Sequence, residues 1–176
     1  MDTILPDRLV EAARKVLEAN RAIGRTIAVA ESCTGGLVSA ALTETPGSSD
    51  VFEAGFITYS DQAKTEMLKV STDVLETFGA VSIAVAWSMA QGALARSQAD
   101  IAVAITGIAG PDGGSEKKPV GTVVFAQAVR GADPQHIVAD ARHFENDGRG
   151  GVRLQAALCA LDLLMPDSPE GIVEAV

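Results

Sequence analysis

Side chains that could act as nucleophiles gather in residues 31–36, which read Glu-Ser-Cys-Thr-Gly-Gly. An apolar run at 26–30 precedes this segment and another at 37–42 follows it, which predicts a strand, a turn and a helix. Backbone N–H groups at the start of a helix stabilise anions and oxyanions. We therefore expect substrate to bind at this turn and to react there with Ser32. The N–H groups expected to hold the oxyanion are those of Thr34, Gly35 and Gly36.

Ser32 has two possible roles, because a serine that follows a strand often caps the next helix. Thr34 lies closer to the helix and could cap it, which would leave the Ser32 hydroxyl free to project into a crevice. Cys33 is a rival nucleophile of higher intrinsic reactivity, although free cysteines are usually buried. Glu31 could orient a base, hold substrate, or be a carboxylate that the helix dipole stabilises.

A serine nucleophile needs a general base. The two histidines, His136 and His143, are seven residues apart in a predicted strand and point to opposite faces, so they are poor candidates. Lys64 is better placed, about one turn into a helix that Ser60 can cap, where the helix dipole and burial would both lower its pKa. Asp61 acts in the opposite direction. The net shift is therefore open from sequence, and a solvated surface lysine is the alternative.

Helices and strands alternate along the chain, which predicts a three-layer α/β/α domain with a mainly parallel sheet and one antiparallel strand. The run 100–106 lacks polar alternation, as in a strand buried on both faces, so it should be central, and 137–142 should lie at the edge. Sites in such sheets lie beyond the carboxyl ends of the strands, so one crevice should hold Ser32, Tyr59 and Thr106. Strands are expected at 26–30, 51–59, 100–106, 120–129 and 137–142, and helices from about 6, 35, 61, 72 and 82, with a last helix that ends before Pro166.

A glycine-rich loop follows the central strand, from Gly107 to Ser115. Its glycines would let backbone N–H groups approach a phosphate closely, but it matches neither the P-loop pattern nor the dinucleotide fingerprint. It is either a second part of the site or an ordinary surface loop. Residues that could bring positive charge to a phosphate, or be solvated, are Lys117, Lys118, Arg149 and Arg153.

Composition limits the class of protein. The 176 residues, 47% hydrophobic and 21% charged, suit a single globular domain over 1–176 with a loose tail from about residue 166. A net charge of −9 argues against nucleic acid or an anionic membrane as partner, since both need clustered positive charge. Two cysteines, no signal-peptide pattern and no apolar run of membrane length predict a cytoplasmic location. We expect no metal site, and apolar helix faces suit a homo-oligomer.

Five short segments together resemble the CinA carboxy-terminal domain family. They are Ala-Glu-Ser-Cys-Thr-Gly-Gly (30–36), Tyr-Ser-Asp-Gln-Ala-Lys (59–64), Gly-Ala-Val-Ser (79–82), Thr-Gly-Ile-Ala-Gly-Pro (106–111) and Lys-Pro-Val-Gly-Thr (118–122). The resemblance extends from about residue 6 to 165 and implies a mixed five-stranded sheet with one antiparallel strand. It also implies an amidohydrolase that converts a small nucleotide, nicotinamide mononucleotide, to nicotinate mononucleotide and ammonia, without metal or cofactor.

The resemblance assigns roles by motif. The family's serine corresponds to Ser32 and its lysine to Lys64, which would act as nucleophile and base. The family's Gly-Asp-Arg before the last helix is Asp-Gly-Arg here, which weakens the expectation that Arg149 binds phosphate. Longer relatives also carry an amino-terminal domain that these residues lack. The residues that would contact the ring, ribose or phosphate are Tyr59, Thr106, Gly107 and Gly110.

Two other functions stay open from the sequence. The family's competence-related name suggests a non-catalytic, nucleotide-binding regulatory module linked to competence or DNA damage, although such a module would need neither Ser32 nor Lys64. A hydrolase of another small amide is the third possibility.

Overall fold

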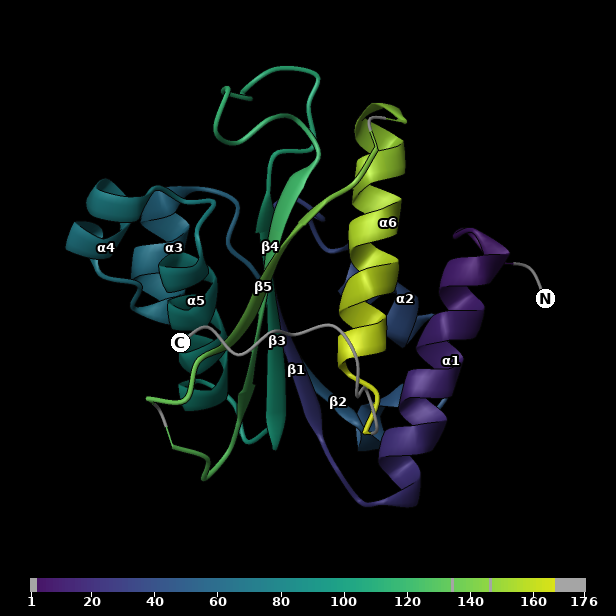
Figure 1. Cartoon of the computed structure of the whole chain (residues 1–176). Helices are drawn as coiled ribbons and strands as arrows, with labels where there is room; N and C mark the ends of the chain where they lie inside the picture. The colour runs from purple at the N-terminus through teal and green to yellow at the C-terminus, as the bar shows by residue number, and fades with distance from the viewer. Residues whose placement is uncertain (1–2, 134, 146, 167–176) are drawn as a thin grey trace.

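A five-stranded sheet runs through the middle of the computed structural model, with helices on both of its faces (Figure 1). The structure describes residues 3–133, 135–145 and 147–166. In chain order the elements are α1 (Asp7–Ala22), β1 (Ile27–Glu31), α2 (Leu37–Thr43), the 3-10 turn η1 (Ser48–Asp50), β2 (Phe52–Ile57), α3 (Asp61–Leu68), α4 (Thr72–Phe78), α5 (Ile83–Ala95), β3 (Ile101–Gly107), β4 (Thr122–Val129), β5 (Val138–His143) and α6 (Gly148–Leu163). The predicted loose tail lies, beyond Pro166, outside the described residues.

The sheet has the strand order β2-β1-β3-β4-β5. β1 pairs in parallel with β2 and β3, whereas β4 is antiparallel to both β3 and β5. Four strands therefore point one way and β4 points the other way. This confirms the predicted mixed sheet with one antiparallel strand, the central place of β3 and the edge place of β5.

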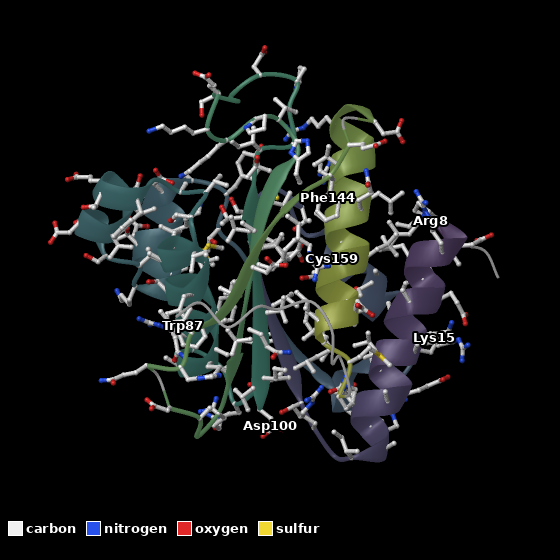
Figure 2. The ribbon with its side chains drawn as sticks, in the orientation of Figure 1. Arg8, Lys15, Trp87, Asp100, Phe144 and Cys159 are labelled. Atoms are coloured by element: carbon white, nitrogen blue, oxygen red, sulfur yellow. The ribbon has the colours of Figure 1, made fainter. Side chains whose placement is uncertain are left out.

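The two helical layers enclose separate cores (Figure 1). α1, α2 and α6 cover the face to which β1 and β3 present isoleucine and valine, while α3, α4 and α5 cover the face to which they present alanine. These small side chains let α5 lie close to the sheet. Gly92 lets α5 approach α3 as well, because a Cβ there would lie 2.2 Å from the Leu68 carbonyl oxygen. Trp87 of α5 is only partly buried against this core (Figure 2).

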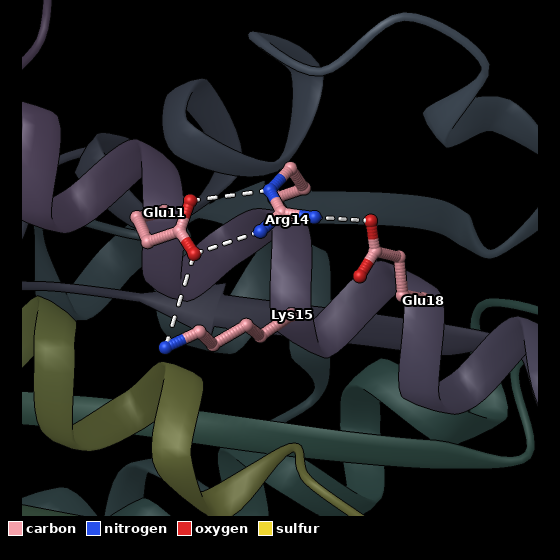
Figure 3. Close-up of polar contacts among 4 residues, drawn as sticks. All are labelled: Glu11, Arg14, Lys15 and Glu18. Atoms are coloured by element: carbon pink, nitrogen blue, oxygen red, sulfur yellow. Dashed lines mark hydrogen bonds and ion pairs between the residues drawn. The ribbon is translucent and has the colours of Figure 1, made fainter.

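α1 shows how the outer helices divide into a buried and a solvated side. Its buried residues are those that the sequence pattern predicts, namely Leu9, Ala13, Val16, Leu17 and Asn20. On the solvated side, Arg14 bonds to Glu11 and Glu18, and Lys15 Nζ lies 3.8 Å from Glu11 (Figure 3). Exposed ion pairs of this kind contribute little stability, so α1 is held mainly by its apolar side.

The carboxyl ends of β1, β2 and β3 meet at one edge of the sheet, because these strands are parallel. Glu31 at the end of β1 is level with Ile57 of β2 and Ile105 of β3. The loop at 108–121 rises at the same end, near the start of α6, whereas Asp100 marks the opposite end (Figures 1 and 2). Within the described ranges, no helix has the length and apolar content needed to cross a membrane.

Candidate active site

The turn after β1 starts its helix later than the sequence predicts. Gly35 and Gly36 have φ values of +60° and +93°, in the left-handed region, so the helical backbone begins only at Leu37. Thr34 does not cap the helix, because its buried hydroxyl has no hydrogen-bond partner among the described residues. The predicted helix is present but begins two residues after Gly35, and the expectation of a Thr34 cap is wrong.

The Glu31 carboxylate caps α2 instead. It accepts hydrogen bonds from the N–H groups of Gly36, Val38 and Ser39, at 3.0, 3.2 and 2.8 Å, and from the Ser39 hydroxyl at 2.8 Å. Its side chain is fully buried. Of the roles open to Glu31, the structure therefore supports the carboxylate at a helix start and not a contact with the base.

This cap changes which N–H groups are available to an oxyanion. The Gly36 N–H donates to Glu31, and the Gly35 N–H donates to the Ser32 carbonyl at 3.0 Å. Two of the three predicted donors are thus already engaged. The N–H groups of Cys33 and Thr34, the two residues after Ser32, donate to no oxygen within the described part of the chain, and both face the Cys33 thiol. Thr34 therefore remains a candidate oxyanion donor, and Cys33 takes the place of Gly35 and Gly36 beside it.

Ser32 is fixed by its backbone and free at its hydroxyl. Its N–H donates to the Ile105 carbonyl of β3 at 2.9 Å, and the residue is 7% exposed. The hydroxyl lines a cleft and makes no hydrogen bond among the described residues. A serine held in this way presents its oxygen to a ligand rather than to the helix.

Lys64 is the buried basic side chain of the site. Ser60 caps α3, as predicted, by accepting a hydrogen bond from the Ala63 N–H at 3.0 Å. Lys64 lies one turn further on, with a side chain only 1% exposed. Its Nζ donates to the Tyr59 carbonyl at 3.5 Å and lies 3.6 Å from Asp61 Oδ1.

The protonation of Lys64 follows from this environment. Burial lowers the pKa of Lys64 below its ordinary value of 10.5, and the Asp61 carboxylate, which acts in the opposite direction, does not cancel the effect. The net shift of the Lys64 pKa, whose direction the sequence left open, is therefore downward. Lys64 Nζ and Ser32 Oγ border the same cleft but make no hydrogen bond of 3.5 Å or less, so proton transfer requires their side chains to close on bound substrate.

Cys33 is poorly suited to be the nucleophile. It is 5% exposed, and burial raises the pKa of its thiol to about 11, with the Glu31 charge acting in the same direction. Only a thiolate is strongly nucleophilic, and this thiol keeps its proton near neutral pH. The structure therefore favours Ser32 over Cys33.

The cleft has a volume of about 240 Å³ and lies at the carboxyl ends of the parallel strands. As the sequence predicts, it brings together Ser32, Tyr59 and Thr106. Its lining consists of Ser32, Cys33, Tyr59, Asp61, Lys64, Ala80, Val81, Thr106, Gly107, Ala109 and Arg149. Neither histidine is among these residues, and the described residues include no group of three or more His, Cys, Asp or Glu that could hold a metal ion.

Arg149 joins the start of α6 to the rim of the cleft. Its Nη2 donates to the Tyr59 hydroxyl at 2.8 Å and its Nη1 to the Gly110 carbonyl at 2.7 Å. Tyr59 is 60% exposed, so this pair faces solvent at the mouth. Gly110 is not in the lining itself and acts by positioning the guanidinium. Despite the altered Asp-Gly-Arg order, Arg149 therefore reaches the site.

Thr106 and Gly107 shape the floor. The Thr106 hydroxyl is buried and donates to the Ala80 carbonyl at 2.8 Å, which fixes the connection between α4 and α5 against β3. Gly107 leaves room for the turn, since a Cβ there would lie 2.8 Å from Val123 Cγ2 and 3.0 Å from Cys33 Sγ. That these two residues touch substrate stays a prediction.

Two residues of the site were missed by the sequence analysis in the roles they take. Arg153 was expected only as positive charge near a phosphate, but its Nη2 donates to the Thr34 carbonyl at 2.8 Å and ties α6 to the turn at 32–36. Its spacing of four from Arg149 was the available signal, because residues four apart share a helix face. Asp61 lines the cleft as well as contacting Lys64, which only the folded chain shows.

Known proteins resemble this chain over most of its length. Proteins named nicotinamide-nucleotide amidohydrolase PncC are 49% identical in Enterobacter agglomerans and 47% in Escherichia coli K12, over 88% and 89% of this chain and 92% of each relative. A crystal structure of the competence/damage inducible protein CihA from Agrobacterium tumefaciens superposes with a TM-score of 0.86 at 45% identity, covering 92% of this chain and 96% of that one.

Some relatives are much longer. A putative competence-damage inducible protein of Symbiobacterium thermophilum is 51% identical over 80% of this chain, and a CinA-like protein of Akkermansia muciniphila is 59% identical over 60% of it. The matches cover only 34% and 26% of those two proteins. Residues 9–167 match the family described as CinA C-terminal domain. The chain belongs to the CinA C-terminal domain family.

Proposed function

We propose that this chain is a nicotinamide-nucleotide amidohydrolase, which converts nicotinamide mononucleotide to nicotinate mononucleotide and ammonia. The observation that carries the proposal is the cleft that holds a free Ser32 hydroxyl beside a buried Lys64 of lowered pKa. The names of the PncC relatives, at 47–49% identity over most of the chain, supply the substrate. A non-catalytic binding module would need no buried base in its cleft.

The first half of the reaction forms an ester. Neutral Lys64 Nζ takes the hydroxyl proton as Ser32 Oγ attacks the carboxamide carbon, and the N–H groups of Cys33 and Thr34 hold the carbonyl oxygen while it carries negative charge. Lys64 then gives its proton to the amide nitrogen. The C–N bond breaks, ammonia leaves, and the acyl group remains on Ser32.

The second half restores the enzyme. A water molecule attacks the ester carbon and passes a proton to Lys64, which returns it to Ser32 Oγ as the C–O bond breaks. Nicotinate mononucleotide leaves. The same lysine thus serves as base and acid in both halves, and the chemistry consumes only water.

The size of the cleft suggests how the nucleotide lies. A volume of about 240 Å³ is below the roughly 300–1,000 Å³ of sites that enclose a whole drug-sized ligand. The carboxamide and ring would fill it, and the ribose and phosphate would extend past its mouth. Arg149 stands at that mouth, held by Tyr59 and Gly110, and would bind the phosphate.

The setting of the reaction is also a proposal. We place it in the cytoplasm, in a chain that acts as a homo-oligomer with neither nucleic acid nor membrane as partner. The net charge of −9 supports the exclusion of polyanions. Light scattering of the purified chain tests the oligomeric state, and a monomer at micromolar concentration would contradict that part.

The test of the activity is direct. Purified chain is incubated with nicotinamide mononucleotide, and ammonia and the acid product are both measured. Equal amounts of the two products are expected, and the Lys64→Met variant should release neither at a comparable rate. Carboxamides with and without a phosphate, assayed in parallel, separate this substrate from other small amides. No turnover of the nucleotide at micromolar enzyme would contradict the proposal.

A further inference from the structure

The cleft lining carries three charged side chains, Asp61, Lys64 and Arg149. Lys64 is 1% exposed and must be neutral to accept a proton from Ser32. When Lys64 is neutral, the cleft lining therefore keeps one negative charge, on Asp61, and one positive charge, on Arg149. A ligand with both a positive and a negative group would match this pair.

The contacts within the site order these charges. Arg149 donates to the Tyr59 hydroxyl at 2.8 Å, Lys64 Nζ donates to the Tyr59 carbonyl at 3.5 Å, and Asp61 Oδ1 lies 3.6 Å from Lys64 Nζ. Tyr59 and Lys64 thus separate the positive from the negative group. Asp61 is 64% exposed, and among the described residues its carboxylate contacts no cation but Lys64. When Lys64 is neutral, the Asp61 charge is available to a ligand.

The chemistry of a nicotinamide nucleotide supplies the matching charges. Its ring nitrogen is bonded to ribose and makes the ring a pyridinium cation, while the phosphate is an anion. One ring carbon separates the charged nitrogen from the carbon that bears the carboxamide. When the carboxamide lies between Ser32 and Lys64, the cationic ring must therefore lie beside the lysine that Asp61 contacts.

We propose that Asp61 is a specificity-determining residue, whose carboxylate attracts the cationic pyridinium ring and so selects the oxidised nucleotide over carboxamides with a neutral ring. This rests on the proposed function, since it assigns a role within the same cleft. A pyridinium nitrogen has no hydrogen to donate, so the interaction is one of charge. An acidic residue in the first turn of α3 would also stabilise that helix, but this role does not depend on the charge of a ligand.

The test compares two nucleotides that differ in ring charge. Nicotinamide mononucleotide and its reduced dihydropyridine form share the carboxamide, ribose and phosphate, and only the first has a cationic ring. Dissociation constants are measured by calorimetry on Ser32→Ala, which cannot form the ester, with and without Asp61→Asn. Because Asp61 is largely exposed, its loss should weaken binding of the cationic nucleotide about fivefold and leave the neutral one nearly unchanged.

Two further variants separate the ring charge from other effects. Glu66→Gln removes the same charge from α3 at a residue that hydrogen-bonds to Gln62 and does not line the cleft, so it should preserve the preference. Repeating the comparison in Lys64→Met removes the lysine charge, and the Asp61 effect should persist there. Circular dichroism checks that each variant is folded.

The outcomes also separate this inference from the proposed function. Equal weakening of both nucleotides by Asp61→Asn, or an unchanged preference, would overturn the role of Asp61 even where the parent enzyme releases ammonia. Failure of Ser32→Ala to bind either nucleotide would overturn it as well. Failure of the parent enzyme to release ammonia from nicotinamide mononucleotide contradicts the proposed function itself.

Discussion

Replacing Glu31 by glutamine removes a buried charge on which the turn at 32–36 and the start of α2 depend. One carboxylate oxygen accepts from the Ser39 N–H and hydroxyl, and the other accepts from the N–H groups of Gly36 and Val38. Glutamine keeps one acceptor oxygen and turns an NH₂ group toward the remaining donors. With this NH₂ group toward Gly36 and Val38, one partly buried and one buried N–H group lose their acceptor, and hydrogen bonds to a charged group are worth about 1.5–3 kcal/mol each. We expect Glu31→Gln to lower the free energy of unfolding by about 3–6 kcal/mol.

This loss is large against the roughly 5–15 kcal/mol that holds a typical domain folded. The free energy of unfolding typically falls by about 1–3 kcal/mol per molar urea, so the urea concentration at the unfolding midpoint should fall by about 2 M. The matched control is Glu53→Gln, in which an exposed carboxylate accepts one backbone hydrogen bond, from the Gln98 N–H at 2.7 Å. That control should change the free energy of unfolding by about 0.5 kcal/mol or less. Equal midpoints for the two variants would refute the account of the turn.

Three other predictions concern residues around Ser32. Burial holds the pKa of Lys64 below 10.5 in the folded state, so folding stability is lost as the pH falls from 10.5 toward the folded-state pKa. The Lys64→Met variant should therefore melt at a higher temperature than the parent at neutral pH. This difference in melting temperature should disappear above pH 10.5. Burial raises the pKa of the Cys33 thiol to about 11, so its alkylation by iodoacetamide should be slow at neutral pH and should accelerate toward pH 11. The Cys33→Ala variant should release ammonia at a rate within about threefold of the parent rate. Gly107→Ala forces a Cβ against Val123 and should cost about 1–3 kcal/mol in urea unfolding while also lowering kcat, and parent-like values of both would contradict the packing described.

The fold was predictable because its signals are local. Apolar spacing identified the buried side of α1 residue by residue, and the absence of polar alternation identified β3 as central. Turn formers and a serine cap marked where most elements begin. Each of these signals lies within a few residues of the feature that it predicts, so one sequence suffices to find it.

The details of the site were less predictable because they depend on contacts between distant segments. Gly35 and Gly36 take left-handed conformations, and Glu31 reaches across them to cap α2, so the expected donors are occupied. Arg153 holds the carbonyl of Thr34 across 119 residues of sequence. The sign of the Lys64 pKa shift depends on burial, which spacing alone does not give. The sequence therefore placed the serine and the lysine, and only the folded chain shows which groups surround them.

We propose that Ser32 attacks the carboxamide, and the rate of ammonia release from nicotinamide mononucleotide by the Ser32→Ala variant shows whether it does. Loss of a nucleophile that forms a covalent intermediate lowers kcat by many orders of magnitude in comparable enzymes. We expect a fall of at least about 1,000-fold, in a variant whose circular dichroism and urea midpoint match those of the parent. A folded Ser32→Ala variant that releases ammonia within tenfold of the parent rate, about 1.4 kcal/mol in activation free energy, would contradict it.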